Sequence, residues 1–253
     1  MNRFEIGMIG GTGGIGRWFV PFFEAAGYPV HRVGRKEGMT LPELAARCRV
    51  VIVSVPIAAT LEVIRRVGPH LPPDSLLMDF TSLKEEPVRE MLKFTAAEVV
   101  GCHPLFGPDC PSLAGQNIIL CPARGDRWLE RFKAIFLEGG ARVTVATPGE
   151  HDRMMAFVQG MTHLDTILAG LTLRDAGITD ATLDAFSTPV FRTKRAIFEK
   201  VFGNRPELYA GLLSGNSNMR GILEVYEKNL DVLKALILSG DAEGLAAFMK
   251  KTP

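Results

Sequence analysis

The sequence predicts an α/β protein in which a doubly wound, mostly parallel sheet is followed by an all-α domain. Two observations predict this class: short apolar runs alternate with helical segments over the first half of the chain, and no convincing strand follows residue 150. Residues 146–149 contain a Pro-Gly pair that breaks the alternation. We therefore expect residues 1–147 to form the first domain and residues 148–253 the second.

The expected strands are short and rich in Val, Ile and Leu, as in sheets that are buried on both faces. They cover residues 4–9, 28–33, 50–55, 75–80, 98–101, 117–121 and 142–145, with helices over residues 57–67 and 126–137. Two Ser/Thr-x-x-Glu capping boxes, Thr40 with Glu43 and Ser82 with Glu85, indicate the starts of two further helices.

A glycine-rich turn directly follows the first strand and opens a helix, with Gly11, Gly13 and Gly16 in a Gly-x-Gly-x-x-Gly pattern. Gly11 allows the tight turn, Gly13 lets the backbone approach a pyrophosphate, and Gly16 lets helix and strand pack closely. The pattern predicts a Rossmann-like dinucleotide site at the helix start; the alternative is a purely structural turn. The predicted cofactor contacts are Gly11, Thr12, Gly13, Gly14, Ile15 and Gly16, with Ser54 and Pro56 at the end of the third strand.

The segment after the second strand favours NADP over NAD. NAD-binding sheets commonly carry Asp or Glu at this point, where it accepts hydrogen bonds from the adenosine ribose. This chain has Gly-Arg-Lys instead, and Arg35 can pair bidentately with a 2′-phosphate. The alternative is that Arg35 and Lys36 are solvated surface charges and that Glu37 binds the ribose.

One histidine lies in a Gly/Pro-rich stretch at a strand end. The stretch reads Gly-Cys-His-Pro-Leu-Phe-Gly-Pro over residues 101–108. Because Pro fixes φ and Gly permits unusual φ, we expect a loop of one shape that presents His103 at the carboxyl end of a strand. Ligands bind at that edge in open parallel sheets. The alternative is a rigid turn whose imidazole caps a backbone carbonyl.

The second half predicts helices alone, over residues 150–173, 188–202, 218–239 and 241–250, with another that begins at residue 206. His151, Met155, Gln159 and His163 recur every four residues and form a slowly rotating stripe, which indicates a ligand-facing surface or an interdomain seam. The two histidines drift apart by roughly a third of a turn, so we expect no shared metal and predict no metal site. Surplus apolar positions favour a homodimer through these helices.

Composition excludes several classes of protein. The 253 residues are 47% apolar with a formal net charge of +1, so there is no basic excess for nucleic acid. No apolar run approaches the roughly 20 residues that span a bilayer, and no signal peptide is recognised, so no membrane partner is expected. The four cysteines have no Cys-x-x-Cys spacing, which favours a reducing, cytoplasmic location.

Taken together, these motifs resemble the prephenate dehydrogenase family, which includes arogenate dehydrogenases. The family's His-Pro-Met-Phe-Gly-Pro loop is similar to the His-Pro-Leu-Phe-Gly-Pro that begins at His103. Its Glu-His-Asp…Met-Ala…Gln…His helix matches residues 150–163, and its Ser-Pro…Pro-x-Leu-Tyr-Ala segment is echoed from Thr188 and from Pro206. The resemblance covers nearly the whole chain, with several independent motifs in the same order.

The resemblance implies oxidative decarboxylation of prephenate to 4-hydroxyphenylpyruvate in tyrosine biosynthesis, with hydride transfer to NAD(P)⁺. It assigns the general base to His103, a hydrogen bond in the same region to Ser82, and pocket-lining positions to His163 and Gln159. A neutral imidazole suits this chemistry because it can accept the substrate's hydroxyl proton as hydride leaves.

One position departs from the family pattern. The family usually has an arginine that grips the substrate's side-chain carboxylate six residues before the proline of Pro-x-Leu-Tyr, and this chain has Lys200 there. Lysine supplies charge without the planar fork of arginine. Three possibilities follow: Lys200 serves with weaker orientation, Arg192 or Arg195 on the same helix takes over, or the substrate differs.

Other substrates and roles stay open. Some family members recognise the amino group of arogenate with an acidic residue shortly after the His-Pro loop; residues 111–114 here read Pro-Ser-Leu-Ala, which favours prephenate. Two alternatives to the family function stay open. The chain could be a different NAD(P)-dependent dehydrogenase that acts on a hydroxy or imino acid, or a nicotinamide-binding regulator without turnover.

Overall fold

The structure is a computed structural model that describes residues 3–35, 38–204 and 206–250. The chain divides into two compact units. The sheet unit runs up to Met154 and includes the segment that ends at Leu212; the helical unit comprises Met155–Asn204 and the chain from Leu213 onward. The sheet unit includes most of the first helix after residue 147, and the domain boundary expected at that residue stays a prediction.

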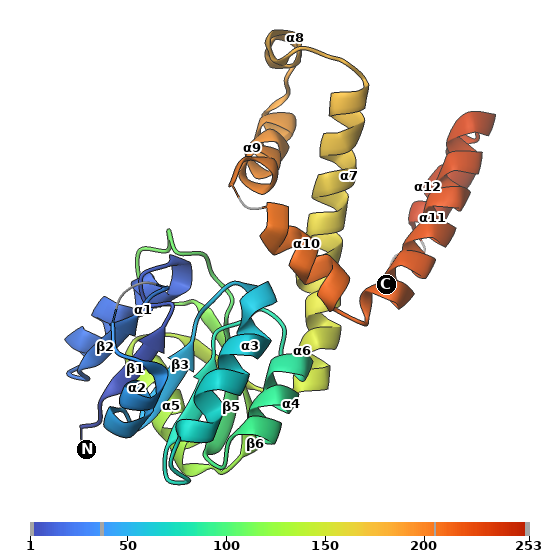
Figure 1. Ribbon diagram of the computed structural model, residues 1–253. Helices are drawn as coiled ribbons and strands as arrows, with labels where there is room; N and C mark the ends of the chain where they lie inside the picture. The colour runs from blue at the N-terminus through green and yellow to red at the C-terminus, as the bar shows by residue number, and fades with distance from the viewer. Residues whose placement is uncertain (1–2, 36–37, 205, 251–253) are drawn as a thin grey trace. The chain divides into compact units, whose positions relative to one another are not determined.

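Seven strands form one sheet in the order β2-β1-β3-β4-β5-β6-β7 (Figure 1). They are β1 (Ile6–Ile9), β2 (Val30–Val33), β3 (Val50–Val53), β4 (Leu76–Asp79), β5 (Glu98–Pro104), β6 (Asn117–Arg124) and β7 (Arg142–Val145). All neighbours are parallel except β5 and β6, which confirms the predicted mostly parallel sheet. Since β2 and β3 lie on opposite sides of β1, the strand order reverses there, and such a switch point is where open α/β sheets bind ligands.

Two strands are longer than the sequence predicts. β5 continues through His103, and β6 continues to Arg124, because the two strands pair antiparallel over this length. His103 lies opposite Ile119 in the ladder. The predicted loop at this histidine is therefore wrong: His103 is a strand residue, and the irregular segment begins after Pro104.

Helices cover both faces of the sheet and give it two apolar cores. One core contains four phenylalanines from α1 and α5, and the other contains side chains from α2, α3 and α4. The predicted capping box of Thr40 with Glu43 is confirmed at the start of α2. The helices that follow the strands are α1 (Gly14–Ala25), α2 (Leu41–Arg47), α3 (Ile57–Val67), the short 3-10 helix η1 (Gly68–His70), α4 (Glu85–Phe94), α5 (Arg127–Glu138), α6 (Pro148–Met155) and, later in the chain, α10 (Pro206–Gly215).

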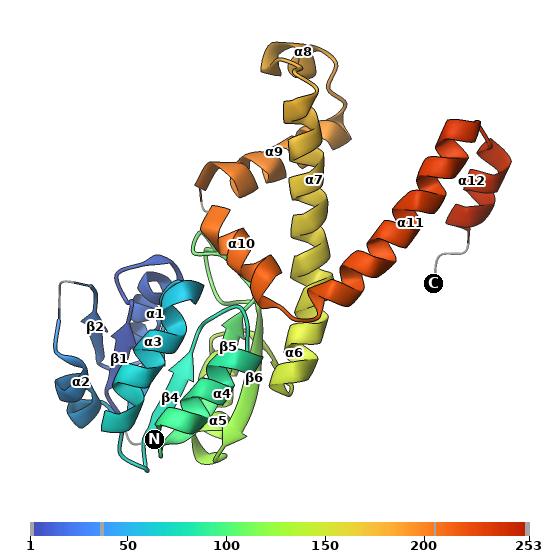
Figure 2. The same ribbon diagram turned by 45° about the vertical axis from the view of Figure 1, so that its right-hand side comes forward.

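In the helical unit, α7 packs against α9, and α12 folds back along α11 (Figure 2). The elements are the π-helix η2 (Ala156–Met161), α7 (Thr162–Asp175), α8 (Asp180–Ala185), α9 (Pro189–Asn204), α11 (Met219–Ser239) and α12 (Ala242–Met249). Large apolar side chains stand exposed on these helices, among them Val190, Leu238 and Met249. Of the helices that the structure describes, none is both long and apolar enough to cross a membrane.

The first helix expected after the sheet is not a continuous α-helix. The π-helix η2 separates α6 from α7. Gly160 lies in η2, and a Cβ there would overlap the sulfur of Met219 on α11, so glycine permits a close approach of the two elements. Because an i→i+5 helix turns by only about 80–85° per residue, η2 reduces the rotation that separates Met155, Gln159 and His163 on a regular α-helix.

Candidate active site

The sheet brings the predicted cofactor and catalytic residues to one edge. Strands β1 to β5 are parallel, so the segments after their carboxyl ends share that edge. The glycine turn follows β1, and Arg35 follows β2. Ser54 and Pro56 follow β3, and Ser82 follows β4. His103 is the last residue but one of β5.

The glycine turn has the shape that a dinucleotide requires. Gly10 has a φ of +83°, and a Cβ there would overlap the carbonyl oxygen of Ser54. A Cβ on Gly16 would overlap the carbonyl oxygen of Gly10, so both positions need glycine. Around Gly13, the nearest atom to a Cβ would be the oxygen of Gly10 at 3.8 Å, which leaves room for a ligand to approach the backbone. Helix α1 begins at Gly14, and its free N–H groups suit a pyrophosphate.

The cation that was predicted at the adenosine ribose lies at this same edge. Arg35 stands two residues beyond β2, and its side chain is exposed. Lys36 and Glu37, on which the choice between NADP and NAD also depends, lie outside the residues that the structure describes. The preference for NADP therefore stays a prediction.

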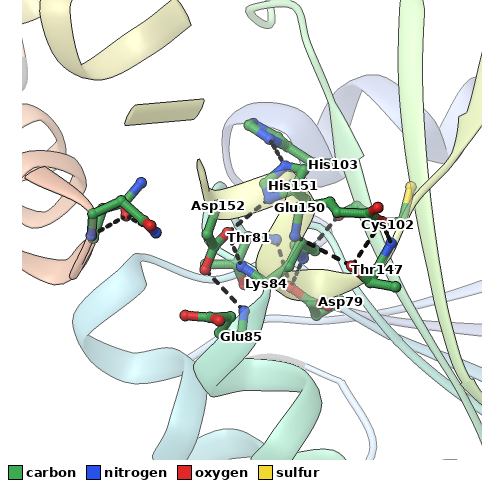
Figure 3. Close-up of polar contacts among 12 residues, drawn as sticks. Asp79, Thr81, Lys84, Glu85, Cys102, His103, Thr147, Glu150, His151 and Asp152 are labelled. Atoms are coloured by element: carbon green, nitrogen blue, oxygen red, sulfur yellow. Dashed lines mark hydrogen bonds and ion pairs between the residues drawn. The ribbon is translucent and has the colours of Figure 1, made fainter. Parts of the chain in front are cut away.

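His103 begins a chain of three buried side chains (Figure 3). Its Nδ1 lies 2.9 Å from Nε2 of His151, and Nδ1 of His151 lies 2.7 Å from Oδ1 of Asp152. His103, His151 and Asp152 are only 3%, 2% and 4% exposed, so water competes little for these hydrogen bonds. His151 and Asp152 belong to α6, which thereby orients the histidine of β5.

The hydrogen bonds determine which nitrogen of His103 carries the hydrogen. An ionised carboxylate only accepts, so Nδ1 of His151 donates to Asp152, and we assign Nε2 of His151 as the acceptor for His103. His103 then donates through Nδ1. Its Nε2 is left as the unprotonated nitrogen, which is the tautomer that a general base at Nε2 requires.

The electrostatic surroundings keep His103 neutral. Burial, followed by the nearby His151 and Lys84, holds the pKa of His103 well below its usual 6.5. Cys102 precedes His103 on the strand and packs in the apolar core, so it points to the opposite face. Burial raises the pKa of Cys102 well above its usual 9.0. The pair is therefore a neutral base beside an inert thiol, and not a thiolate–imidazolium nucleophile.

Asp152 also holds the start of α4. Its Oδ1 accepts a hydrogen bond from the N–H of Lys84 at 2.8 Å, and its Oδ2 accepts one from the N–H of Glu85 at 2.9 Å. The predicted capping box of Ser82 with Glu85 is wrong, because α4 begins at Glu85 and that residue is too early to close such a box. A carboxylate 67 positions away satisfies the free N–H groups instead.

A fully buried ion pair adjoins this chain. Nζ of Lys84 contacts Oδ2 of Asp79 and donates to the carbonyl oxygen of Cys102 at 3.1 Å. Gly101 makes room for the lysine, because a Cβ there would stand 2.9 Å from its Cδ. The pair ties the end of β4 to the end of β5, and the lysine cation opposes protonation of His103.

Sequence reasoning missed three members of this arrangement, Asp79, Lys84 and Asp152, and it placed His151 on the predicted stripe without a role beside His103. A usable signal existed for the adjacent His151 and Asp152, two polar residues in a helix whose neighbours were expected to contact a ligand. No local signal marks Lys84 as buried, since lysine is seldom buried without a partner and Asp79 lies five residues away. Ser82 is half-buried in the segment between β4 and α4.

The predicted substrate residues of the helical unit lie on η2, α7 and α9. Gln159 is in η2, and His163 is in the first turn of α7. Burial lowers the pKa of His163 below 6.5, so this ring is also neutral at pH 7.

The three candidate cations of α9 have different surroundings. Arg195 forms ion pairs with Asp180, Asp184 and Glu199. Arg192 and Lys200 are exposed. Because three carboxylates already surround Arg195, it is less suited than Lys200 to bind an incoming carboxylate.

One group of described residues brings possible metal ligands together: Glu5, His31 and Cys48. Oε2 of Glu5 lies 2.6 Å from His31 Nε2 and accepts a hydrogen bond from Arg47 at 2.7 Å. Burial raises the pKa of Cys48 to about 12, so its thiol keeps its proton. The group thus has the character of an ion-paired cluster, and it lies near the amino end of β1, away from the site edge.

Two models of one family match the chain. They are the nucleotide-binding domain of prephenate dehydrogenase, over residues 33–145, and its dimerization domain, over residues 147–251. The chain belongs to the prephenate dehydrogenase family. Its relatives include the T-protein of Haemophilus influenzae, 34% identical over 97% of this chain and 66% of that protein. A probable arogenate/prephenate dehydrogenase of Methanocaldococcus jannaschii is 32% identical over 99% of this chain and 60% of that protein.

The chain therefore spans less than two thirds of the length of these family relatives. Solved structures of the family share its fold over nearly the whole chain. Prephenate dehydrogenase from A. aeolicus, in complex with hydroxyphenyl propionate and NAD⁺, has a TM-score of 0.76 at 21% identity and covers 99% of this chain and 96% of that one. Arogenate dehydrogenase of Synechocystis has a TM-score of 0.75 at 20% identity, with 98% and 97% covered. The predicted α/β fold with a helical second part is confirmed.

The lowered pKa of His103 predicts how stability depends on pH. Below pH 6.5 the unfolded chain binds a proton at this residue while the folded chain does not, so the free energy of unfolding falls as the pH drops from 6.5 through the folded pKa. The contribution of His103 to the slope of the unfolding free energy against pH approaches about 1.4 kcal/mol per pH unit. The free energy of unfolding is measured by urea unfolding at about pH 7.5 and at about pH 5.5. Tryptophan fluorescence is the probe, since Trp18 and Trp128 both lie in the sheet unit.

We expect His103→Asn to lose much of this pH dependence, whereas His70→Asn, which changes an exposed histidine of the same unit, keeps it. Equal pH dependence in the wild type and in His103→Asn would show that His103 titrates alike in the folded and unfolded chains.

Proposed function

We propose that the chain is an NAD(P)-dependent dehydrogenase that converts prephenate to 4-hydroxyphenylpyruvate and CO₂, a step of tyrosine biosynthesis. The observation that carries the proposal is His103, whose hydrogen bonds make Nε2 the accepting nitrogen, at the edge of the sheet where the glycine turn fits a dinucleotide. Membership of the prephenate dehydrogenase family supplies the substrate class.

The residues of this chain account for the proton in the reaction. A nicotinamide cofactor held at the glycine turn, residues 11–16, would supply the acceptor for the hydride of the ring carbon that carries the hydroxyl group. Nε2 of His103 accepts the hydroxyl proton as a carbonyl forms, and Nδ1–H keeps its bond to His151, so Asp152 stabilises the resulting imidazolium through His151. The bond to the ring carboxylate then breaks, and its electron pair makes the ring aromatic. The former carbonyl oxygen regains the proton from His103, whose low pKa favours this return.

Four further residues bind the substrate in this proposal. Ser82 hydrogen-bonds near the reacting hydroxyl group, and Gln159 and His163 line the pocket. Lys200 pairs with the side-chain carboxylate, because it is exposed on α9 while Arg195 is already engaged with three acidic side chains. Arg192 is the alternative cation on the same helix.

The cofactor in this proposal is NADP. It binds through its pyrophosphate at the glycine turn, residues 11–16, with Ser54 and Pro56 beside it at the end of β3 and Arg35 at the adenosine ribose. The support is the exposed arginine after β2, in a place where NAD-binding sheets commonly carry an acidic residue.

The proposed assembly is a homodimer through the helical unit. The family model names this part a dimerization domain, and large apolar side chains such as Val190, Leu238 and Met249 are exposed on it. We place the enzyme in the cytoplasm, because all four cysteines are free thiols, as a reducing compartment favours.

The test of the proposed function is the formation of reduced nicotinamide, with prephenate and with arogenate, each with NAD⁺ and NADP⁺. We expect turnover of prephenate. His103→Asn should lower kcat by about 10²–10⁴-fold while cofactor binding stays within about twofold, because the variant removes only the base. His70→Asn is the control. Near-normal turnover by His103→Asn would contradict the base assignment, and turnover of arogenate alone would replace prephenate as the substrate.

Substrate recognition by Lys200 predicts a second kinetic result. We expect Lys200→Ala to raise KM for prephenate by about tenfold or more and to change kcat much less, because it removes a charge that binds the substrate before and during reaction. Lys200→Arg should restore or improve KM, since it supplies the planar fork. Lys194→Ala changes another exposed lysine of α9 and serves as the control. Unchanged KM in Lys200→Ala would remove this residue from the site.

A further inference from the structure

Arg32 of β2 lies beside the glycine turn, although the glycine motif gives no reason to expect it there. It pairs in register with Met8 of β1, and a Cβ on Gly11 would stand 3.1 Å from Cγ of Arg32. The aliphatic stem of the arginine therefore packs along the first glycine of the motif, while the residue as a whole remains exposed. Such packing restricts the stem and leaves the guanidinium group available to a ligand.

The chemistry of the neighbouring positions is cationic. Arg35 follows three residues later and is also exposed, and the described stretch from residue 30 to residue 35 contains no carboxylate. An acidic residue at the end of the second strand would accept hydrogen bonds from ribose hydroxyl groups and would repel a phosphate group. Two arginines do the reverse, because each guanidinium presents donors in a fork that matches phosphate oxygens.

We infer that Arg32 and Arg35 together form a subsite for the 2′-phosphate of the adenosine ribose, and that Arg32 is the specificity-determining member that the sequence motif does not reveal. The inference rests on the proposed dinucleotide binding at the glycine turn. Arg32 has the firmer placement of the two, because its stem is held against Gly11, whereas Arg35 lies in the irregular segment after the strand. Fewer side-chain rotamers are then lost when phosphate binds.

The test measures binding of NADP⁺, NAD⁺, 2′,5′-ADP and 5′-ADP to the full chain by isothermal titration calorimetry. We expect the wild type to bind NADP⁺ more tightly than NAD⁺, and 2′,5′-ADP more tightly than 5′-ADP. Arg32→Gln keeps much of the stem and removes the charge. It should weaken binding of NADP⁺ and 2′,5′-ADP by about 10–100-fold and change the affinity for NAD⁺ by less than about threefold.

Arg49→Gln is the matched control for charge, since Arg49 pairs with Asp74 and directly precedes β3, at the opposite edge of the sheet. It should leave all four affinities unchanged.

Three outcomes would overturn the inference. Equal losses for NADP⁺ and NAD⁺ in Arg32→Gln would mean that the guanidinium contacts the shared adenosine part. Unchanged affinities in that variant, or a wild type that prefers NAD⁺, would remove Arg32 from a phosphate subsite while leaving dinucleotide binding intact. A wild type that binds neither dinucleotide would overturn the proposed function together with the inference.

Discussion

The arrangement of the site depends on one buried carboxylate. Asp152 accepts hydrogen bonds from two free N–H groups at the start of α4 and from the imidazole of His151. If this buried carboxylate had fewer hydrogen-bond partners, part of its desolvation cost would be left uncompensated. Each N–H group that now donates to it would also lose a hydrogen bond if the carboxylate were removed. The same carboxylate therefore sets where α4 begins and which tautomer His103 adopts. Through these contacts, the position of α6 beside β5 and the start of α4 becomes a condition for the proposed proton transfer.

The fold and the cofactor edge could be predicted because their signals are local. Alternating apolar runs give the strands, and a Gly-x-Gly-x-x-Gly turn after the first strand needs only neighbouring residues to be recognised. His103 was assigned to a loop because its Pro and Gly neighbours suggest one, but the antiparallel ladder with β6 keeps it in a strand. Ser82 with Glu85 satisfied the capping pattern, and yet a distant carboxylate took over the role. Local patterns cannot reveal a competitor from elsewhere in the chain.

The helical unit shows the same limit. Repetition of polar residues every four positions predicted a rotating stripe, because a regular α-helix was assumed. The π-helix that reduces this rotation includes Gly160, whose lack of a side chain makes room for Met219 of α11, a contact between elements far apart in the sequence. The family pattern identified Lys200 as a departure, and composition gave no means of choosing among the cations of α9. The ion pairs of Arg195 with acidic residues of α8 and α9 make it the least suited of the three, and Lys200 and Arg192 stay as candidates.

The tautomer of His103 is the central claim, and nitrogen-15 NMR of the imidazole rings tests it most directly. At about pH 7.5, where the lowered pKa of His103 keeps that ring neutral, we expect shifts of a protonated Nδ1 and an unprotonated Nε2 for His103, and a protonated Nδ1 for His151. Asp152→Asn should disturb this pattern in both rings, since it removes the acceptor that fixes His151. A protonated Nε2 on neutral His103 in the wild type would contradict the claim, because that nitrogen would then have no lone pair with which to accept the substrate's proton.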